Sequence, residues 1–196
     1  MRKYVGALLV SVGCYFFSCK EASVKKDYSG WSAYAGSKDG IRYSSNEQIT
    51  PENISQLKVA WTFSSNDKDT GNRSQNQCNP IMVDGILYGI SPRLKLFALN
   101  AATGEQKWLF DPAGEAFFKV SRGMMYWLDE KSDDKRIFYS VGNRTYAINV
   151  TDGKPVRNFG KNGFINLAEN LDRDTSSFEP YVVGTTPGVI FKDLLI

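Results

Sequence analysis

The chain has 196 residues, of which 42% are hydrophobic and 23% are charged, and its net charge is +3. This length and composition predict one folded domain or two small ones and exclude fibrous and disordered classes, while the slight positive charge favours no nucleic-acid partner. There is no histidine, which excludes Ser-His-Asp and Cys-His nucleophiles, imidazole bases and His-ligated metal centres, so any chemistry must depend on carboxylates, Arg, Lys, Tyr or a cofactor.

The N-terminus has the pattern of an export signal. Met1-Arg2-Lys3 is positively charged, and Tyr4 to Ser18 is a run of apolar and small residues without a charge. This run is shorter than the about 20 residues that a membrane-spanning helix needs. We therefore expect the protein to be exported.

A cysteine follows this run directly. Cys19, preceded by Ser18 and followed by a polar stretch, resembles the lipidation site of bacterial lipoproteins. We expect a lipoprotein signal peptide over residues 1–18 and a tether over 19–29, which would leave the protein facing the periplasm and anchored to a bacterial membrane by lipid. Cys14 is the competing lipidation site, and an ordinary cleaved signal peptide is the alternative to a lipoprotein signal.

The rest of the chain is rich in short apolar or alternating runs, which predict β-strands. Only Thr50–Leu57 has helix signals, namely a Thr N-cap, a Pro in the first turn and an early Glu. The predicted strands are Leu57–Ser64, Pro80–Val83, Ile86–Ser91, Leu96–Leu99, Lys107–Phe110, Arg136–Val141, Thr145–Asn149 and Val189–Ile196.

Turn dipeptides separate these strands. Asp84-Gly85, Thr103-Gly104, Gly142-Asn143 and Asp152-Gly153 combine glycine with a small polar residue, as tight hairpin turns require. They predict antiparallel pairs of strands that are consecutive in the chain.

One segment of the chain is repeated. The residues from Phe97 to Trp108 recur from Tyr146 to Arg157, and the Ala, Asn and Gly positions that match lie 49 residues apart. A period of about 50 residues fits one four-stranded blade of a β-propeller. In such a blade an aromatic residue such as Trp108 would cover the face toward the next blade, whereas the second copy has Arg157 at this position. A pair of unrelated hairpins is the alternative.

The repeat and several other segments resemble a known family. Ala98–Trp108 resembles the tryptophan docking motif of the eight-bladed quinoprotein dehydrogenases, which use pyrroloquinoline quinone (PQQ). The alcohol-oxidising branch of this family has two adjacent cysteines near the Arg-Gly pair, whereas this chain has none before Arg122-Gly123. In this detail the chain most resembles the glucose and sugar dehydrogenase branch. Further matches follow in the family's order: Gly30–Gly36, Gly40–Ser44, Ile49–Ile54, Gln77–Ile81, Leu87–Pro92 and Ser121–Gly123.

The resemblance implies an all-β fold, in which residues 30–196 form about three four-stranded antiparallel blades of an eight-bladed propeller. Because this is too little chain for a closed ring, we expect an N-terminal fragment of a longer enzyme, inactive by itself. The implied activity is PQQ-dependent oxidation of the hydroxyl of a glucose-like aldose or of an alcohol, with electrons passed to a membrane quinone or cytochrome c. The alternative is a non-catalytic propeller lipoprotein that binds other proteins at the outer membrane.

The resemblance also implies which residues bind the three carboxylates of PQQ. Arg122 is the first candidate, and Gln77, Thr185 and Thr186 are candidates to line the same pocket, although each could be an ordinary loop residue. Arg93 occupies a region where some sugar-oxidising relatives carry a histidine, and a fixed cation there could bind a carboxylate but could not act as a base.

Two further groups are implied by the family. A Ca²⁺ ion would act as Lewis acid, and an Asp would act as the catalytic base, both held by blades beyond Ile196. The acidic cluster in the present chain is expected to be a solvated loop, since it lacks the other ligands of a calcium loop. Its members are Asp172, Asp174 and Glu179.

Overall fold

The structure is a computed structural model that describes residues 28–71, 74–112, 120–129, 131–172, 177–178 and 180–196. The predicted signal peptide, Cys14, Cys19 and most of the tether lie outside these residues. Within the described part, no helix has the length and apolar character needed to cross a membrane.

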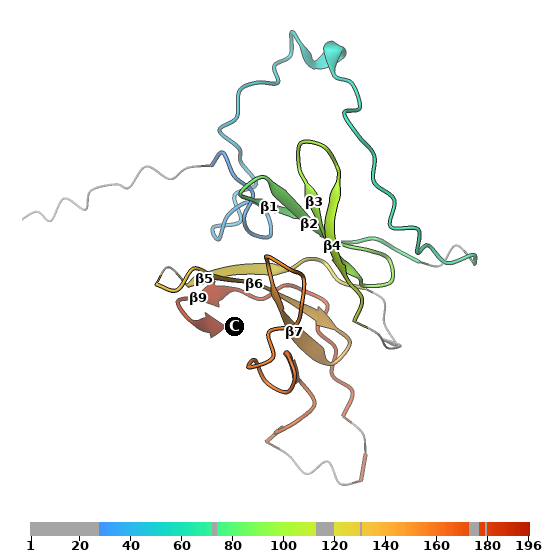
Figure 1. The fold of residues 1–196 in the computed structure, drawn as a ribbon, viewed down its shortest axis with the longest axis vertical. Helices are drawn as coiled ribbons and strands as arrows, with labels where there is room; N and C mark the ends of the chain where they lie inside the picture. Colours follow the sequence, from blue (N-terminus) through green and yellow to red (C-terminus); the bar gives the residue numbers. More distant parts are fainter. Residues whose placement is uncertain (1–27, 72–73, 113–119, 130, 173–176, 179) are drawn as a thin grey trace, which may run out of the picture.

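Two four-stranded antiparallel sheets form the body of the protein (Figure 1), and in each the strands are joined in chain order. The first sheet consists of β1 (Ile81–Val83), β2 (Ile86–Ile90), β3 (Leu96–Asn100) and β4 (Gln106–Phe110). The second consists of β5 (Met125–Asp129), β6 (Asp134–Val141), β7 (Arg144–Asn149) and β8 (Phe164–Asn166).

A third, two-stranded sheet follows near the C-terminus. It pairs β9 (Ile190–Phe191) with β10 (Leu194–Leu195), and Figure 1 shows it beside the second sheet. The described residues therefore form two four-stranded blades and a hairpin that follows them, which confirms the predicted all-β partial propeller.

The predicted turn chemistry is confirmed at the tight hairpins. Asp84 and Gly85 join β1 to β2 with φ angles of +51° and +74°, and Gly142 begins the turn from β6 to β7 with φ +60°. Asn and Gly accept such left-handed backbone angles at little cost, so the local sequence sets the register of each hairpin.

Some predicted elements are wrong. Leu57–Ser64 is not a strand, because no strand among the described residues lies beside it to form a ladder. The predicted strand Val189–Ile196 is a hairpin instead, since Lys192 turns the chain at φ +54° without a glycine to mark the turn. The predicted helix Thr50–Leu57 is reduced to a 3₁₀ turn at Ile54–Gln56.

The sheets stack face to face through two apolar layers. One layer joins the first sheet to the second and includes Tyr88 and Leu96 from one side and Ile137 and Ile148 from the other, all at most 2% exposed. The opposite face of the second sheet packs against Ile190 of β9. Each fully buried side chain of this kind contributes about 1.5–3 kcal/mol, so successive blades are held together mainly by apolar burial.

Tryptophans lock successive units together at one end of the sheets. The Nε1 atom of Trp108 on β4 donates to the carbonyl oxygen of Val150 at 2.8 Å, and its ring lies against Gly153. The predicted role of Trp108 in covering the next blade is thus confirmed. Trp61 makes the same contact one unit earlier, donating to Ala101 O at 3.1 Å and lying against Gly104.

Candidate functional site

The opposite end of the sheets collects the segments that carry the predicted site residues. Because the strands alternate in direction, the segments that lead into β1, β5 and β9 lie at the same end as the β2–β3 and β6–β7 turns. We call this the site end, and it comprises residues 77–80, 91–95, 121–123, 142–143 and 184–187.

Main-chain hydrogen bonds tie the site end together across the blades. The Asn79 N–H donates to the Arg122 carbonyl at 2.9 Å, and the Arg122 N–H donates to the Thr185 carbonyl at 2.8 Å. A parallel link runs from the Gly184 N–H to the Gly142 carbonyl at 2.9 Å. The starts of three successive sheets are therefore held at fixed separations by the backbone, with Arg122 in the middle.

The side chains that this backbone presents are mostly open to solvent. Arg122 is exposed, and among the described residues no carboxylate forms an ion pair with it. Gln77 is exposed, and its Nε2 donates to Gln75 Oε1 at 2.6 Å. Thr185 is half-buried and Thr186 is exposed. The structure thus brings these predicted residues to one end and leaves their polar groups accessible to a ligand.

Arg93 also lies at the site end. It is an exposed residue of the turn between β2 and β3. The turn follows β2, and Gln77 lies in the segment before β1, the strand that pairs with β2. Neighbouring strands in a sheet lie about 4.8 Å apart, so the turn begins about that distance from the segment that carries Gln77.

The cations of the site end differ in their partners. Its five segments contain Arg93, Lys95 and Arg122. Lys95 pairs with Asp111, which follows β4 at the same end, and the Asp67 carboxylate bonds to the β2–β3 turn. Among the described residues no carboxylate forms an ion pair with Arg93 or Arg122, so both remain available to attract an anion. A guanidinium, an amide and two hydroxyls are donors suited to carboxylate oxygens.

A cavity of about 1070 Å³ lies beside this end. It is an open cavity bordered by the N-terminal segment around Tyr34, by β5 with Tyr126 and Trp127, and by the β9–β10 hairpin. None of the predicted site residues lines it; it begins at Met124 and Pro187, next to the hydrogen-bonded backbone, and continues along β5.

The structure offers no metal centre in the part that it describes. No three His, Cys, Asp or Glu side chains of these residues come together in a way that could hold a metal ion. Asp172 of the predicted solvated loop is exposed, while Asp174 and Glu179 lie outside the described residues.

Two contributors to the site were missed by sequence reasoning. Asn79 anchors Arg122 through its main chain, and its Nδ2 also donates to Arg122 O at 3.4 Å. Asp67 is buried and bonds to Ser91, at the start of the turn that carries Arg93. Asn79 lies within the matched segment Gln77–Ile81, but the resemblance gave it no role, and Asp67 lies in no motif. An aspartate in a polar run is expected at the surface until its neighbours in space are known.

The partly buried Cys78 lies next to Gln77. Desolvation raises the pKa of the Cys78 thiol to about 11. At neutral pH the protonated thiol is therefore favoured over the thiolate, which is the reactive form. Cys78 acts as a small apolar group packed against the layer between the sheets.

Comparison with known proteins places the chain in one family. Residues 31–196 match the PQQ family described as "Glucose/ethanol/alcohol dehydrogenase, beta-propeller domain". The chain is 32% identical to quinoprotein glucose dehydrogenase A of Acinetobacter calcoaceticus over 83% of its length, and 34% identical to quinoprotein glucose dehydrogenase of Escherichia coli K12 over 85%. It spans 23% of the length of each of these relatives.

Solved structures show the same fold. A quinohemoprotein alcohol dehydrogenase from Pseudomonas putida HK5 superposes with a TM-score of 0.63 at 22% identity, covering 84% of this chain and 22% of that chain. A europium-containing methanol dehydrogenase superposes with a TM-score of 0.52 at 24% identity, covering 66% of this chain and 22% of that chain.

Proposed function

Because this chain belongs to the PQQ-dependent glucose/ethanol/alcohol dehydrogenase β-propeller family, we propose that it supplies the first blades of a PQQ-dependent oxidoreductase. The proposed reaction is oxidation of the hydroxyl of a glucose-like aldose or of an alcohol, with electrons passed to a membrane quinone or cytochrome. The observation that carries this proposal is the backbone link from Asn79 through Arg122 to Thr185, at an end of the sheets where neither Arg93 nor Arg122 forms an ion pair among the described residues.

The residues at the site end fit PQQ, a planar quinone with three carboxylates. Arg122 would bind a carboxylate with its guanidinium, and Gln77 and the hydroxyls of Thr185 and Thr186 would donate further hydrogen bonds. Such charge-assisted bonds are about twice as strong as neutral ones, so a few of them suffice to orient a rigid ring. When bound, PQQ supplies the group that accepts a hydride from the substrate carbon.

The remaining parts of the proposed enzyme would be supplied by sequence that follows Ile196. We propose that these parts are the Ca²⁺ ligands, the catalytic Asp and most of the substrate pocket. Export, lipidation at Cys19 and anchoring at a periplasm-facing membrane complete the proposal and would place the enzyme next to a membrane electron acceptor.

The test uses the full-length gene product, supplied with PQQ and Ca²⁺. We expect it to reduce an artificial dye with glucose, another aldose or an alcohol, and to retain quinone absorbance after dialysis. Arg122→Ala should weaken PQQ binding about 10- to 100-fold, because it removes a charge-assisted hydrogen bond. Arg157→Ala removes an exposed arginine outside the site end and should leave PQQ binding unchanged.

The non-catalytic scaffold predicts the opposite results. A protein that binds no PQQ and reduces no dye with any polyol, aldose or alcohol would support the scaffold and overturn the dehydrogenase. Loss of PQQ affinity of the same size in Arg122→Ala and Arg157→Ala would show that Arg122 is not a specific ligand.

A further inference from the structure

The turn between β2 and β3 has an unfavourable backbone angle next to Arg93. Leu94 has φ +63°, in the left-handed region that a branched side chain rarely occupies. Main-chain bonds close the turn, since the Ser91 N–H donates to Lys95 O and the Leu94 N–H donates to Ser91 O, both at 2.9 Å. Unfavourable backbone angles persist where surrounding contacts over-determine them, and such places are often functional.

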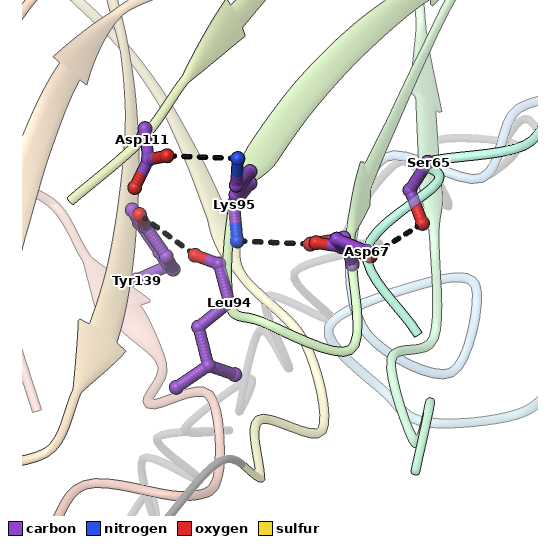
Figure 2. Close-up of polar contacts among 7 residues, drawn as sticks. Ser65, Asp67, Leu94, Lys95, Asp111 and Tyr139 are labelled. Atoms are coloured by element: carbon purple, nitrogen blue, oxygen red, sulfur yellow. Dashed lines mark hydrogen bonds and ion pairs between the residues drawn. The ribbon is translucent and has the colours of Figure 1, made fainter. Parts of the chain in front are cut away.

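Contacts from the second blade hold one side of this turn. The Leu94 side chain is 2% exposed within the layer between the sheets. Its carbonyl accepts a hydrogen bond of 3.2 Å from the hydroxyl of Tyr139 on β6 (Figure 2). Leu94 is thus fixed both by its apolar side chain and by its main chain.

Asp67 holds the other side through Ser91. The Ser91 hydroxyl donates to the Asp67 carboxylate and accepts a hydrogen bond of 3.1 Å from the Lys95 N–H. Figure 2 shows the second partner of this carboxylate, the hydroxyl of Ser65, which donates to it at 2.7 Å. Two hydroxyls therefore satisfy the carboxylate, and one of them belongs to the turn.

Asp67 is buried, with 8% of its surface exposed. Burial of a carboxylate is costly unless its oxygens are hydrogen-bonded. Among the described residues no lysine or arginine forms an ion pair with it; the neighbouring Lys95 instead bonds to Asp111, with 2.8 Å between Nζ and Oδ2 (Figure 2). Asp67 therefore orders the turn without neutralising a cation. The positive charge of Arg93 remains available to a ligand.

We propose that Asp67 is a positioning residue which, through Ser91, orders the turn that presents Arg93 to the carboxylates of the cofactor. The inference rests on the proposed function, because it needs an anionic ligand at the site end. Ser91 and Leu94 are buried on either side of Arg93, so the turn is anchored at both flanks while Arg93 itself is exposed.

The experiment measures PQQ affinity of the full-length apoprotein by titration with PQQ and quenching of tryptophan fluorescence. Asp67→Ala and Arg93→Ala should each weaken binding about 10-fold, because each removes the same charge-assisted contact, directly or through the turn. Asp67→Asn keeps one acceptor for Ser91 and should restore most of the affinity. Asp84→Asn, at the other end of the first sheet, is the matched control and should have no effect.

The double variant Asp67→Ala/Arg93→Ala decides whether the two residues act together. If Asp67 acts through Arg93, the double variant binds PQQ no more weakly than Arg93→Ala alone. If Asp67→Ala weakens binding by the same factor with or without Arg93, its role is general stability and the inference is overturned.

Hydrogen exchange provides a readout that needs no cofactor. The amides of Ser91, Leu94 and Lys95 should exchange faster in Asp67→Ala than in the unmodified protein, and unchanged exchange would overturn the inference. If Arg122→Ala weakens PQQ binding while Arg93→Ala does not, the proposed function stands and this inference falls. If the unmodified protein binds no PQQ, the proposed function fails first.

Discussion

The indole nitrogen of Trp108 donates a hydrogen bond to the carbonyl oxygen of Val150, 2.8 Å away on the following blade. The ring of the same tryptophan lies against Gly153, where an added Cβ atom would be 2.6 Å from its Cδ2. Gly153 also has φ +69°, so both its backbone angle and the tryptophan ring exclude a side chain.

This contact predicts how single substitutions change stability. Trp108→Phe should lower the free energy of unfolding by about 1 kcal/mol through the lost hydrogen bond, and Trp108→Ala by about 2–4 kcal/mol through the lost packing. Urea unfolding of the full-length gene product measures both changes. Lys107→Ala, an exposed position on the same strand, is the control and should change stability by less than about 0.5 kcal/mol.

Gly153→Ala should be destabilising by about 2 kcal/mol or more, because it adds strain and displaces the ring. In the background of Trp108→Ala the ring is gone, so the second substitution should cost measurably less. If Gly153→Ala lowers the free energy of unfolding equally with and without Trp108, the packing contact is contradicted. The backbone angle alone would then explain the loss of stability.

The thiol of Cys78 predicts slow alkylation. With its pKa raised to about 11 by burial, the thiolate fraction at pH 8 is about 100-fold lower than for a thiol with the ordinary value of 9.0. Iodoacetamide labelling of the Cys78 peptide, followed by mass spectrometry, should be slow in the native protein and rapid in urea. Rapid native labelling would contradict the burial of this residue.

The same shift predicts a pH dependence of stability. The folded pKa of Cys78 is raised, so folding favours the protonated thiol, and its stabilising contribution is complete below pH 9. The free energy of unfolding should fall as the pH rises from about 9 to 11, and Cys78→Ser should flatten this part of the curve relative to the unmodified protein.

The unpaired segment Leu57–Ser64 predicts association of the present chain when it is isolated. Val59 is 81% exposed and Leu57 is 57% exposed, and no strand of the described residues covers their backbone. Extended apolar segments with free donors and acceptors pair with other chains. Sedimentation of residues 20–196 should show concentration-dependent oligomers, and replacing Leu57 and Val59 by lysine should reduce them. A monomer that melts cooperatively would contradict the proposal that these residues belong to a longer protein.

Lipidation at Cys19 predicts incorporation of labelled palmitate when the protein is expressed in a bacterium. Cys19→Ala should abolish the label and release the protein from the membrane fraction, whereas Cys14→Ala should leave both unchanged. The reverse pattern would identify Cys14 as the anchor, and unlabelled protein in all three forms would indicate an ordinary cleaved signal peptide.

Local chemistry explains which elements could be predicted from the sequence. The Asp84-Gly85 and Gly142-Asn143 hairpins and the Asn100-to-Gly104 turn are fixed by residues that accept left-handed angles or bond to their own backbone. Asn100 Oδ1 accepts from the N–H groups of Ala102 and Thr103 at 2.9 and 3.1 Å. These residues favour such turns through local chemistry alone, so the repeat could be found without a structure.

Other elements depend on distant neighbours. β5 and β8 were not predicted, and Leu57–Ser64 was wrongly predicted as a strand, because strand formation requires a partner that the local pattern does not reveal. The residues of the proposed site were named one by one through resemblance, and they stay a prediction; the backbone link that joins three of their segments was not predicted. The bond from Asn79 to Arg122 joins main-chain groups that any residue type possesses, so it leaves no trace in the sequence.

Main-chain hydrogen bonds join Asn79, Arg122 and Thr185. The positions of these three residues are therefore set by backbone groups, whereas the chemistry offered at the site end is set by their side chains. Exchanging a side chain at one of these places alters the charge or the donor that is offered, while the distances among the three attachment points stay the same. The side chains offered at this end can therefore change one residue at a time, while the backbone links beneath them are kept.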